Sequence, residues 1–453
     1  MSQNAMVAQA LPERNEVYAE LESKVAAALE HARRNGADGA EASASQHGGL
    51  EVTARMGEVE TIEHTRDRGV SVTVYLGRSK GNASSADLRD SSIRECVERA
   101  IDIARYTEPD PCNGLPDLDR LAVDFPDLDM WHPAPLDVDA AIQRALEMEA
   151  AGREEARITN SEGANVSGDY GLSVQGNSHG FMGRSEGTSY GQSCVLIAGQ
   201  GDAMQRDYWY DNRRSIADLE APAETGRKAA ERTVQRLGAH KLGTRDAAVA
   251  FAPEVARSLL GHLLGAISGS ALYRNASFLK DQLGTQLFPD WLGLVERPFL
   301  PRAPGSASFD GEGVATRERA IVSGGVLEGY LLSSYSARRL GMQSTGNAGG
   351  AHNLRVEAET RSVADILSGM GEGLLVTEVM GQGVSMVTGD YSRGASGFWV
   401  ENGVIAYPVE EVTIAGNLRD IWQRIRALGD DVDDRGNIQC GTIWIERMTI
   451  AGA

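Results

Sequence analysis

Apolar residues recur at helical spacing between Pro253 and Tyr273. Val255, Leu259 and Leu263 follow one another at intervals of four residues, which is typical of a helix that buries one face. Pro253 suits the first helical turn, because the N–H that proline lacks has no partner there in any case. The pattern therefore predicts a single buried helix over Pro253–Tyr273.

Three glycines interrupt this apolar stripe. Gly261, Gly265 and Gly269 also lie four residues apart, and each costs about 1 kcal/mol relative to alanine inside a helix. A chain tolerates that cost where another backbone approaches closely or where the helix bends. We therefore expect close packing at the glycines. The only imidazole of this helix, His262, is either a site residue or a histidine packed near the core.

The first part of the chain alternates between helical and extended patterns. Helices are predicted over Glu16–Arg34 and Ser91–Tyr106. Between them lie four stretches with a period of two residues: Glu41–Gln46, Leu50–Met56, Glu58–His64 and Val70–Leu76. Gly48-Gly49, Gly57 and Gly69 separate the stretches as hairpin connections would. Residues 1–106 are thus predicted to form an N-terminal α+β domain.

Residues 107–137 are rich in proline and aspartate and are predicted to be an extended connection. Their acids lack the spacing of a calcium loop, so we interpret them as solvated. Residues 138–240 are predicted to form a second α+β segment packed with the first. Its predicted elements are a helix capped by Asp137, strands at Ala156–Asn160, Asn165–Ser167 and Leu172–Gly176, a hairpin of Ser189–Ala198 with Met204–Tyr210, and a helix over Leu219–Leu237.

Residues 241–453 carry mostly short extended patterns around few helices. Predicted strands include Ala247–Phe251, Gly373–Val379, Val384–Tyr391, Ala395–Glu401 and Thr442–Ile450, with helices at Ser334–Leu340 and Asn417–Leu428. Asn402-Gly403 is a strong signal for a tight hairpin turn. The predicted fold class is α+β, with N-terminal α+β layers followed by a C-terminal, mostly antiparallel β domain that encloses the glycine-rich helix.

Composition narrows the possible partners and compartment. The 453 residues carry a formal net charge of −20, which argues against nucleic acid or an anionic membrane as the main partner. Four scattered cysteines in so long a chain do not make a disulfide framework. The sequence shows neither a signal-peptide pattern nor an apolar run long enough to span a membrane, so a cytoplasmic location is expected.

Known catalytic motifs are absent from the sequence. It contains no HExxH, no GxSxG and no phosphate-binding P-loop. Cys440 is interpreted as a buried structural thiol, with a ligand role as the alternative. The run from Thr345 to Asn353 suits a loop that exposes backbone N–H groups to an extended peptide, and a plain glycine-rich turn fits it equally well. The candidate peptide-binding residues are Thr345, Gly346, Asn347, Gly349, Gly350, His352 and Asn353.

Long segments of the chain resemble the TldD/PmbA family. They are STGNAGGAHNLRVE (Ser344–Glu357), SGFWVENGVIAYPVEEVTIAGNL (Ser396–Leu418), NIQCGTIWIERMTIAG (Asn437–Gly452) and, near the N-terminus, ETIEHTRDRGVSVTVYLGRSKGNASSADL (Glu60–Leu88). The resemblance covers nearly the whole chain and favours the PmbA, or TldE, branch of the family over the TldD branch.

The resemblance implies one subunit of a cytoplasmic, two-subunit metalloprotease. In such a complex the TldD-type partner carries zinc on an HExxxH helix, with a cysteine near its C-terminus, and the PmbA-type subunit pairs with it. The family is associated with the maturation of microcin precursors and the degradation of an antitoxin, and an older name calls it a modulator of DNA gyrase. Unfolded peptide is expected to lie in extended form against a sheet.

This chain departs from the zinc motif that the resemblance implies for the TldD-type partner. If Leu259–Ala266 corresponds to the partner's zinc helix, Gly261 and Ala266 stand where the two histidines would be, and His262 replaces the glutamate. A hydrolytic zinc needs about three protein ligands, an open water position and a base. Cys440 resembles the third ligand and is at most a relic. No metal or other cofactor is therefore expected in this chain, and zinc is expected in the partner subunit.

Three functions remain open from the sequence. The chain is predicted to be a non-catalytic PmbA/TldE-type subunit that acts with a TldD-like, zinc-bearing partner on unfolded peptides. The first alternative is an independent, homodimeric metallopeptidase that uses His262 and Cys440, with His352 nearby. The second is a peptide-binding scaffold without any protease partner. A homodimer is also conceivable when the chain is alone.

Overall fold

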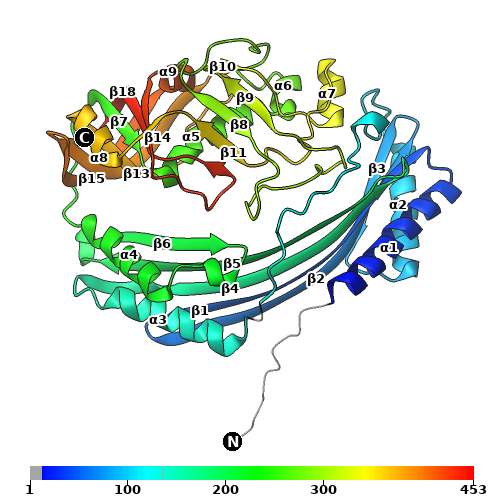
Figure 1. The fold of residues 1–453 in the computed structure, drawn as a ribbon, viewed down its shortest axis with the longest axis horizontal. Coiled ribbons are helices and arrows are strands. Elements are labelled where there is room, and N and C mark those ends of the chain that lie inside the picture. The colour runs from blue at the N-terminus through cyan, green and yellow to red at the C-terminus, as the bar shows by residue number, and fades with distance from the viewer. Residues whose placement is uncertain (1–12, 135, 453) are drawn as a thin grey trace, which may run out of the picture. The chain divides into compact units, whose positions relative to one another are not determined.

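The computed structural model describes residues 13–134 and 136–452. By their contacts the residues form two compact units, which Figure 1 draws as a ribbon. Of the described residues, the first unit comprises those up to Val234 together with Ala307–Ala315, and the second comprises Gln235–Ser306 with those from Thr316 onward. The segment Ala307–Ala315, which the sequence places in the C-terminal domain, thus belongs to the first unit. No described helix is long and apolar enough to cross a membrane.

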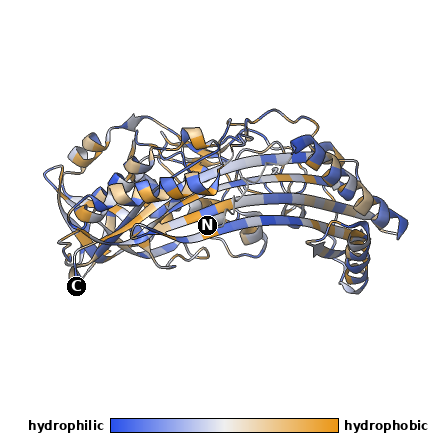
Figure 2. Ribbon diagram, turned by 90° about the horizontal axis from the view of Figure 1, so that it is seen from below, coloured by the Kyte–Doolittle hydropathy of each residue, from blue (hydrophilic) through white to orange (hydrophobic). Residues whose placement is uncertain are grey.

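The first unit is built on one six-stranded antiparallel sheet with the order β3-β2-β1-β4-β5-β6. Its strands are β1 (Gly39–Arg55), β2 (Glu58–Leu76), β3 (Ser79–Ser85), β4 (Ile158–Asn177), β5 (Met182–Ala198) and β6 (Gln205–Arg213). Figure 2 shows hydrophilic and apolar residues interspersed along these long strands. In β1 this gives a regular alternation of buried and more exposed positions.

Two of the predicted hairpin connections in this sheet are wrong. Gly48-Gly49 lies inside β1, and Gly69 lies inside β2. β1 pairs with β2 on one side and with β4 on the other through both glycines, so the strand continues instead of turning. Gly57 is the real turn, with a left-handed φ of 84°. The three short strands predicted between Ala156 and Gly176 likewise merge into β4.

Four helices pack against this sheet in two pairs. They are α1 (Arg14–Arg34), α2 (Asp90–Tyr106), α3 (Val138–Arg153) and α4 (Pro222–Gln235), and three short 3₁₀ turns lie at Leu118–Arg120, Gly201–Ala203 and Ile216–Asp218. α1 and α2 share one apolar cluster with β1, β2 and β4. α3 and α4 share another with β1, β4 and β5. Asp137 caps α3 as predicted, because its side chain accepts the N–H of Ala140.

The second unit contains two sheets. The larger has the order β12-β16-β18-β15-β14-β13-β7, and β18 also pairs with β7, so β7, β13, β14, β15 and β18 close into a ring of five strands. Its strands are β7 (Arg245–Phe251), β12 (Thr360–Arg361), β13 (Gly373–Met380), β14 (Asp390–Glu401), β15 (Val404–Asn417), β16 (Ile425–Gly429) and β18 (Ile443–Ala451). The smaller sheet has the order β10-β9-β8-β11-β17. It comprises β8 (Gly293–Glu296), β9 (Arg319–Ser323), β10 (Val326–Leu327), β11 (Leu354–Glu357) and β17 (Ile438–Gln439).

Five helices accompany these sheets: α5 (Pro253–Ala266), α6 (Gly269–Tyr273), α7 (Ser334–Leu340), α8 (Val363–Met370) and α9 (Leu418–Gln423). The helix predicted over Asn417–Leu428 is wrong beyond Gln423, because the chain from Ile425 onward pairs with β18. Val384–Tyr391 is a turn closed by one β-bridge instead of a strand. α8 was not predicted. The α+β fold class and the mostly antiparallel second unit are confirmed.

Candidate functional site

The helix predicted over Pro253–Tyr273 is two helices in the structure. α5 ends at Ala266, and Ser268 caps α6 by accepting the N–H of Ala271. Between the helices the chain exchanges backbone hydrogen bonds with Leu331, from Gly269 N to Leu331 O (2.8 Å) and from Leu331 N to Ile267 O (3.0 Å). This long-range pairing breaks the helix. The apolar stripe of α5 is buried as predicted.

The three glycines of this region have different surroundings. A Cβ at Gly261 would meet only a side-chain atom of Ile438 at 3.8 Å, and one at Gly265 would meet only the sulfur of Met386 at 3.8 Å. Both are ordinary van der Waals distances. A Cβ at Gly269 would lie 2.2 Å from the hydroxyl of Ser336. Close packing therefore explains Gly269 but not Gly261 or Gly265.

His262 lies half-buried on α5 with an unsatisfied ring nitrogen. Its Nε2 atom is buried and has no hydrogen-bond partner among the described residues, and the same is true of the hydroxyl of Tyr391. The two rings are packed edge to face with centroids 5.9 Å apart. Burial, and then the positive charge of Arg393, lowers the pKa of His262 below its usual value. His262 is therefore neutral at physiological pH.

Cys440 is buried and protonated. It follows β17 and exposes 1% of its surface. Burial and the nearby carboxylate of Asp433 raise the pKa of its thiol to about 12, although Arg257 opposes this shift. Burial would also raise the pKa of Asp433, but hydrogen bonds from Arg435 lower it overall. A thiolate at Cys440 is thus disfavoured beside an ionised carboxylate.

These residues do not fit a zinc ion. Gly261 and Ala266 offer no side-chain donor, and Ala266 is fully buried. Zinc would need Cys440 as a thiolate, whereas burial keeps its thiol protonated. No group of three His, Cys, Asp or Glu side chains able to hold a metal occurs among the described residues. The orphan Nε2 of His262 is one potential donor, and one donor does not make a hydrolytic site.

The second candidate region, the loop Thr345–Asn353, is organised around the buried carboxylate of Glu296. The two oxygens of Glu296 accept hydrogen bonds from Asn347 Nδ2 (2.8 Å), His352 N (2.8 Å) and Arg319 Nε (2.9 Å). Arg319 also donates to Asn347 Oδ1 at 2.8 Å. Glu296 lies on β8, 51 residues before Asn347 in sequence. The polar side chains of the loop thus face inward.

The remaining side chains of the loop are also used internally. Both ring nitrogens of His352 face backbone carbonyls, Nδ1 that of Gly305 (3.2 Å) and Nε2 that of Gly346 (3.0 Å). Asn353 donates to Arg297 O and to the Ser306 hydroxyl. Only Gly349 and Gly350 are exposed, with φ values of 113° and 117°. What this loop can offer a peptide is the backbone of these two glycines.

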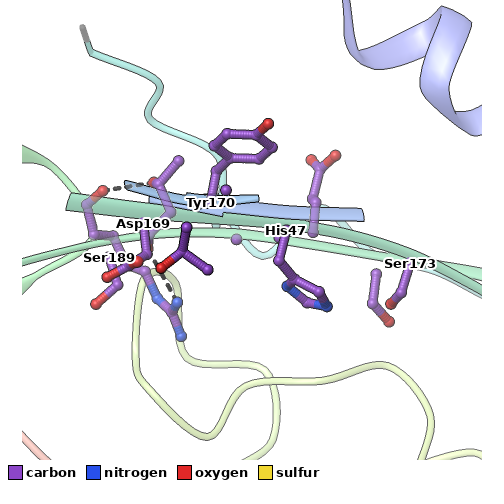
Figure 3. Close-up of a pocket in the computed structure, with 13 residues that line it drawn as sticks. His47, Asp169, Tyr170, Ser173 and Ser189 are labelled. Carbon is purple, nitrogen blue, oxygen red and sulfur yellow. Dashed lines mark hydrogen bonds between the residues drawn. The ribbon is translucent and has the colours of Figure 1, made fainter. Parts of the chain in front are cut away.

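The first unit contains a pocket, with several polar residues in its lining, that the sequence did not suggest. It has a volume of about 380 Å³. Figure 3 shows His47, Asp169, Ser173 and Ser189 on one face of the sheet and Tyr170 on the other. The register explains this face, because His47 is paired with Gly171 and Gly171 with Gly187 on the next strand. In the sequence, the signal that could have indicated this pocket was the presence of glycines at positions that pair with large side chains on neighbouring strands.

Glycines let the pocket side chains lie flat on the sheet. A Cβ at Gly171 would lie 2.7 Å from the imidazole of His47, and one at Gly187 would lie 3.1 Å from the guanidinium of Arg214. Burial lowers the pKa of Arg214, which donates to Thr188 O at 3.1 Å. Burial, and then Glu51, raises the pKa of Asp169. The pocket is thus lined by the carboxyl group of Asp169 and the guanidinium of Arg214 together with apolar surface, and it holds none of the residues predicted from the sequence.

Three domain models match successive parts of the chain. They are PmbA/TldA metallopeptidase domain 1 over residues 40–104, the central domain over 131–237 and the C-terminal domain over 244–452. The chain belongs to the PmbA/TldD metallopeptidase family. The resemblance noted in the sequence is therefore confirmed.

Similar proteins support the same assignment. The chain is 49% identical to Metalloprotease PmbA of Escherichia coli O157:H7 over 433 residues, which cover 95% of this chain and 96% of that protein. It is 48% identical to a PmbA homologue of Haemophilus influenzae, over 96% of both chains. A Bacteroides thetaiotaomicron protein described as a candidate modulator of DNA gyrase has the same fold, with a TM-score of 0.91, 27% identity and coverage of 95% and 99%. TldE from Thermococcus kodakarensis shares the fold with a TM-score of 0.82 and 20% identity, over 95% and 99% of the two chains.

Proposed function

We propose that this chain is the non-catalytic, PmbA/TldE-type subunit of a cytoplasmic TldD/TldE metalloprotease. The observation that supports the proposal is the α5 face, on which the resemblance would put Gly261 and Ala266 at the positions of the zinc-binding histidines. Neither has a donor atom, and the Cys440 thiol is held protonated. The zinc and the water-activating base would therefore come from a TldD-like partner.

Unfolded or extended peptides, such as microcin precursors or an antitoxin, are the proposed substrates. Gly349 and Gly350 support this role, because they expose backbone at the end of a loop that Glu296 holds rigid. Backbone hydrogen bonds read an extended peptide independently of its side chains. The chain would position the peptide, and the partner would cleave it.

Several similarities support the complex. The relatives at 48–49% identity are named metalloproteases, and a structural neighbour is named TldE. A Buchnera aphidicola protein named as a TldD homologue is 22% identical over 85% of this chain. In a complex of two subunit types with the same fold, one type could lack the zinc ligands while the other carries them.

The test measures zinc content and peptide cleavage by the full chain alone and with a TldD-like subunit that carries HExxxH. We expect less than stoichiometric zinc and no cleavage for the chain alone, and zinc-dependent cleavage for the pair. His262→Ala in this chain should leave cleavage by the pair intact, as should the exposed control His179→Ala.

The second candidate is an independent, homodimeric metallopeptidase, which the orphan Nε2 of His262 favours. Stoichiometric zinc in the isolated chain, together with cleavage that is lost in His262→Ala but kept in His179→Ala, would replace the proposal by this candidate. If the purified chain neither cleaves peptides with any HExxxH subunit nor binds one, the peptide-binding scaffold is the better description.

A further inference from the structure

The pocket on the six-stranded sheet lies on the face opposite the four helices. On β1, Ala44 and Val52 belong to the apolar clusters that the sheet shares with the helices. Successive side chains of a strand point to opposite faces, so His47 points away from the helices. Figure 3 shows Asp169 on the same face as His47. The apolar packing of this unit therefore does not account for these two side chains.

Glycines keep the floor of the pocket low. Three side chains lie over glycines of neighbouring strands: Asp169 over Gly49, His47 over Gly171 and Arg214 over Gly187. A Cβ at Gly49 would lie only 2.0 Å from Oδ1 of Asp169. None of these three glycines has a left-handed φ, so space and not backbone conformation favours them. Glycine inside a strand weakens the strand and often marks a place where a ligand approaches closely.

The two opposite charges of the pocket lie over different strands. The carboxyl group of Asp169 covers Gly49 on β1, and the guanidinium of Arg214 covers Gly187 on β5. Gly49 pairs with Asp169, whereas Gly187 pairs with Gly171, two residues further along β4. Strands lie about 4.8 Å apart and rise about 3.4 Å per residue. The positions of Gly49 and Gly187 are therefore about 12 Å apart, on a diagonal across β4.

The guanidinium end of this diagonal is held in place. The hydroxyl of Thr188 donates to Arg214 O at 2.7 Å, and Arg214 Nη1 donates to Thr188 O at 3.1 Å. Burial lowers the pKa of Arg214 and raises the pKa of Asp169. Burial therefore disfavours the charged form of both groups, and a ligand of opposite charge at each end would compensate.

The third charged residue in the lining faces the other way. The carboxylate of Glu186 accepts hydrogen bonds from Arg14 Nη1 at 2.8 Å and from Tyr18 Oη at 3.0 Å, both on α1. It therefore belongs to the helix side of the sheet. On the pocket side, Figure 3 shows the imidazole of His47 and the hydroxyl of Ser173. Such groups can form hydrogen bonds with the peptide groups of a ligand.

The separation of the two charges limits the ligand. An ammonium group at Asp169 and a carboxylate at Arg214 would each lie within about 3 Å of their partners. The two charges of the ligand itself would then be about 6–12 Å apart. An extended peptide spans at most about 3.3–3.6 Å per residue, so this separation corresponds to two or three residues. The pocket volume of about 380 Å³ also lies within the usual range of small-molecule sites.

We propose that this pocket binds a zwitterionic peptide of two or three residues, with its ammonium group at Asp169 and its carboxylate at Arg214. The inference rests on the proposed function in one respect, because short peptides of this kind are what cleavage by the complex would release. The termini of a longer extended peptide are too far apart to reach both charges. The site would thus distinguish cleavage products from substrates.

Isothermal titration calorimetry of the isolated full chain tests the site with trialanine as the probe. We expect a dissociation constant on the order of 1 mM. N-acetyl-trialanine lacks the ammonium group, trialanine amide lacks the carboxylate, and alanine cannot reach both charges. Each of these three should bind at least about fivefold more weakly than trialanine. These comparisons use the wild-type chain, so they do not depend on how any variant folds.

Two variants assign each end of the peptide to its residue. In Asp169→Asn, trialanine and N-acetyl-trialanine should bind equally, while the amide should still bind more weakly. In Arg214→Gln, trialanine and its amide should bind equally, while the acetylated peptide should still bind more weakly. The control Asp202→Asn, an exposed carboxylate outside the pocket lining, should retain both differences. Circular dichroism checks that each variant is folded, and a folding defect would not remove only one of the two differences.

The proposal is wrong if trialanine does not bind at ten times the expected dissociation constant, or if alanine or either blocked peptide binds as tightly. It is equally wrong if the two variants keep the discrimination of the wild type. Failure of the proposed protease role would be recognised separately. That role is read from zinc and cleavage in the presence of a partner, whereas this binding is measured on the chain alone.

Discussion

His262 and His352 lie in two regions of the second unit that differ in whether their buried polar groups have hydrogen-bond partners. His352 belongs to a loop whose side chains and backbone converge on the buried Glu296, and both its ring nitrogens face carbonyl oxygens. His262 lies on an otherwise apolar helix face with a buried ring nitrogen that no described residue contacts. The first arrangement is a completed polar network, and the second leaves a buried ring nitrogen without a hydrogen-bond partner among the described residues.

The two regions thus differ in how completely their buried polar groups are hydrogen-bonded. Buried polar groups are retained when every one has a partner, because an unsatisfied group costs free energy. The loop meets this condition through Glu296, Arg319 and Asn347. On α5, glycine and alanine need no partner. Four predictions test this contrast, from the largest expected effect to the smallest.

Removing the charge of Glu296 should have the largest effect. In Glu296→Gln, the buried guanidinium of Arg319 loses its counter-ion, and an amide N–H₂ group replaces an acceptor. Breaking a buried ion pair from one side costs about 3–5 kcal/mol. Urea denaturation of the full chain should show this loss in free energy of unfolding.

The matched control for that variant is Glu318→Gln, an exposed carboxylate 3.8 Å from Arg297. It should change the free energy of unfolding by no more than about 0.5 kcal/mol. If Glu296→Gln cost as little as the control, the loop would not depend on its buried network.

Alanine at the glycines of the helix region should give effects of opposite sign. Gly269→Ala forces a Cβ against the side chain of Ser336 and should destabilise by about 1–3 kcal/mol. Gly261→Ala meets no such obstacle and should stabilise by up to about 1 kcal/mol, because alanine is the better helix former. Thermal unfolding of both variants measures the difference. Destabilisation in Gly261→Ala would mean that this helix face is closely packed after all.

The thiol of Cys440 should resist alkylation at neutral pH. Burial raises its pKa to about 12, above the usual value of 9.0. The unfolded chain therefore loses this proton first, so the group's contribution to stability is complete below pH 9 and declines as pH rises toward 12. Iodoacetamide labelling followed by mass spectrometry should modify Cys440 at pH 8 only in denaturant. Labelling of the native chain at that pH would show an accessible thiolate and reopen the question of a ligand role.

The smallest expected effect is a pH dependence from His262. Because its pKa is lowered from 6.5 in the folded chain, the unfolded chain binds the proton first as pH falls. Its contribution to stability is present above pH 6.5 and is lost below it. His262→Phe should flatten the stability curve between pH 7 and pH 5 relative to the exposed control His179→Phe. Equal slopes in both variants would contradict a buried neutral imidazole.

Local patterns predicted much of the second unit correctly. The limits of α7 match, and Asn402-Gly403 forms the expected turn, with φ values of 52° and 79°. The start of α5 at Pro253 and its buried stripe also follow from neighbouring residues alone. The comparison of Gly261 and Ala266 with a zinc motif needed only the order of residues, because a side chain without a donor atom cannot bind metal in any fold.

Other features depend on partners that lie far away in sequence. Gly48-Gly49 reads as a turn by itself, yet β2 and β4 pair with it on both sides and keep it extended. The loop Thr345–Asn353 has the composition of a ligand-binding loop, but Glu296 and Arg319 turn its polar side chains inward. The sequence of the loop has no periodicity that would predict the inward orientation of these side chains.

The sequence by itself thus determined the family, the apolar stripe of α5 and the absence of zinc ligands at Gly261 and Ala266, since these depend on side-chain chemistry and short-range spacing. The tertiary structure alone decided where α5 breaks, which glycines are closely packed and which sheet edge stays open. Leu331 separates α5 from α6 by forming hydrogen bonds with the backbone between them. β3 leaves Glu58–Arg68 uncovered because it is only seven residues long. The helix break arises from a contact between distant segments, whose hydrogen bonds outweigh the weaker preferences of the local sequence.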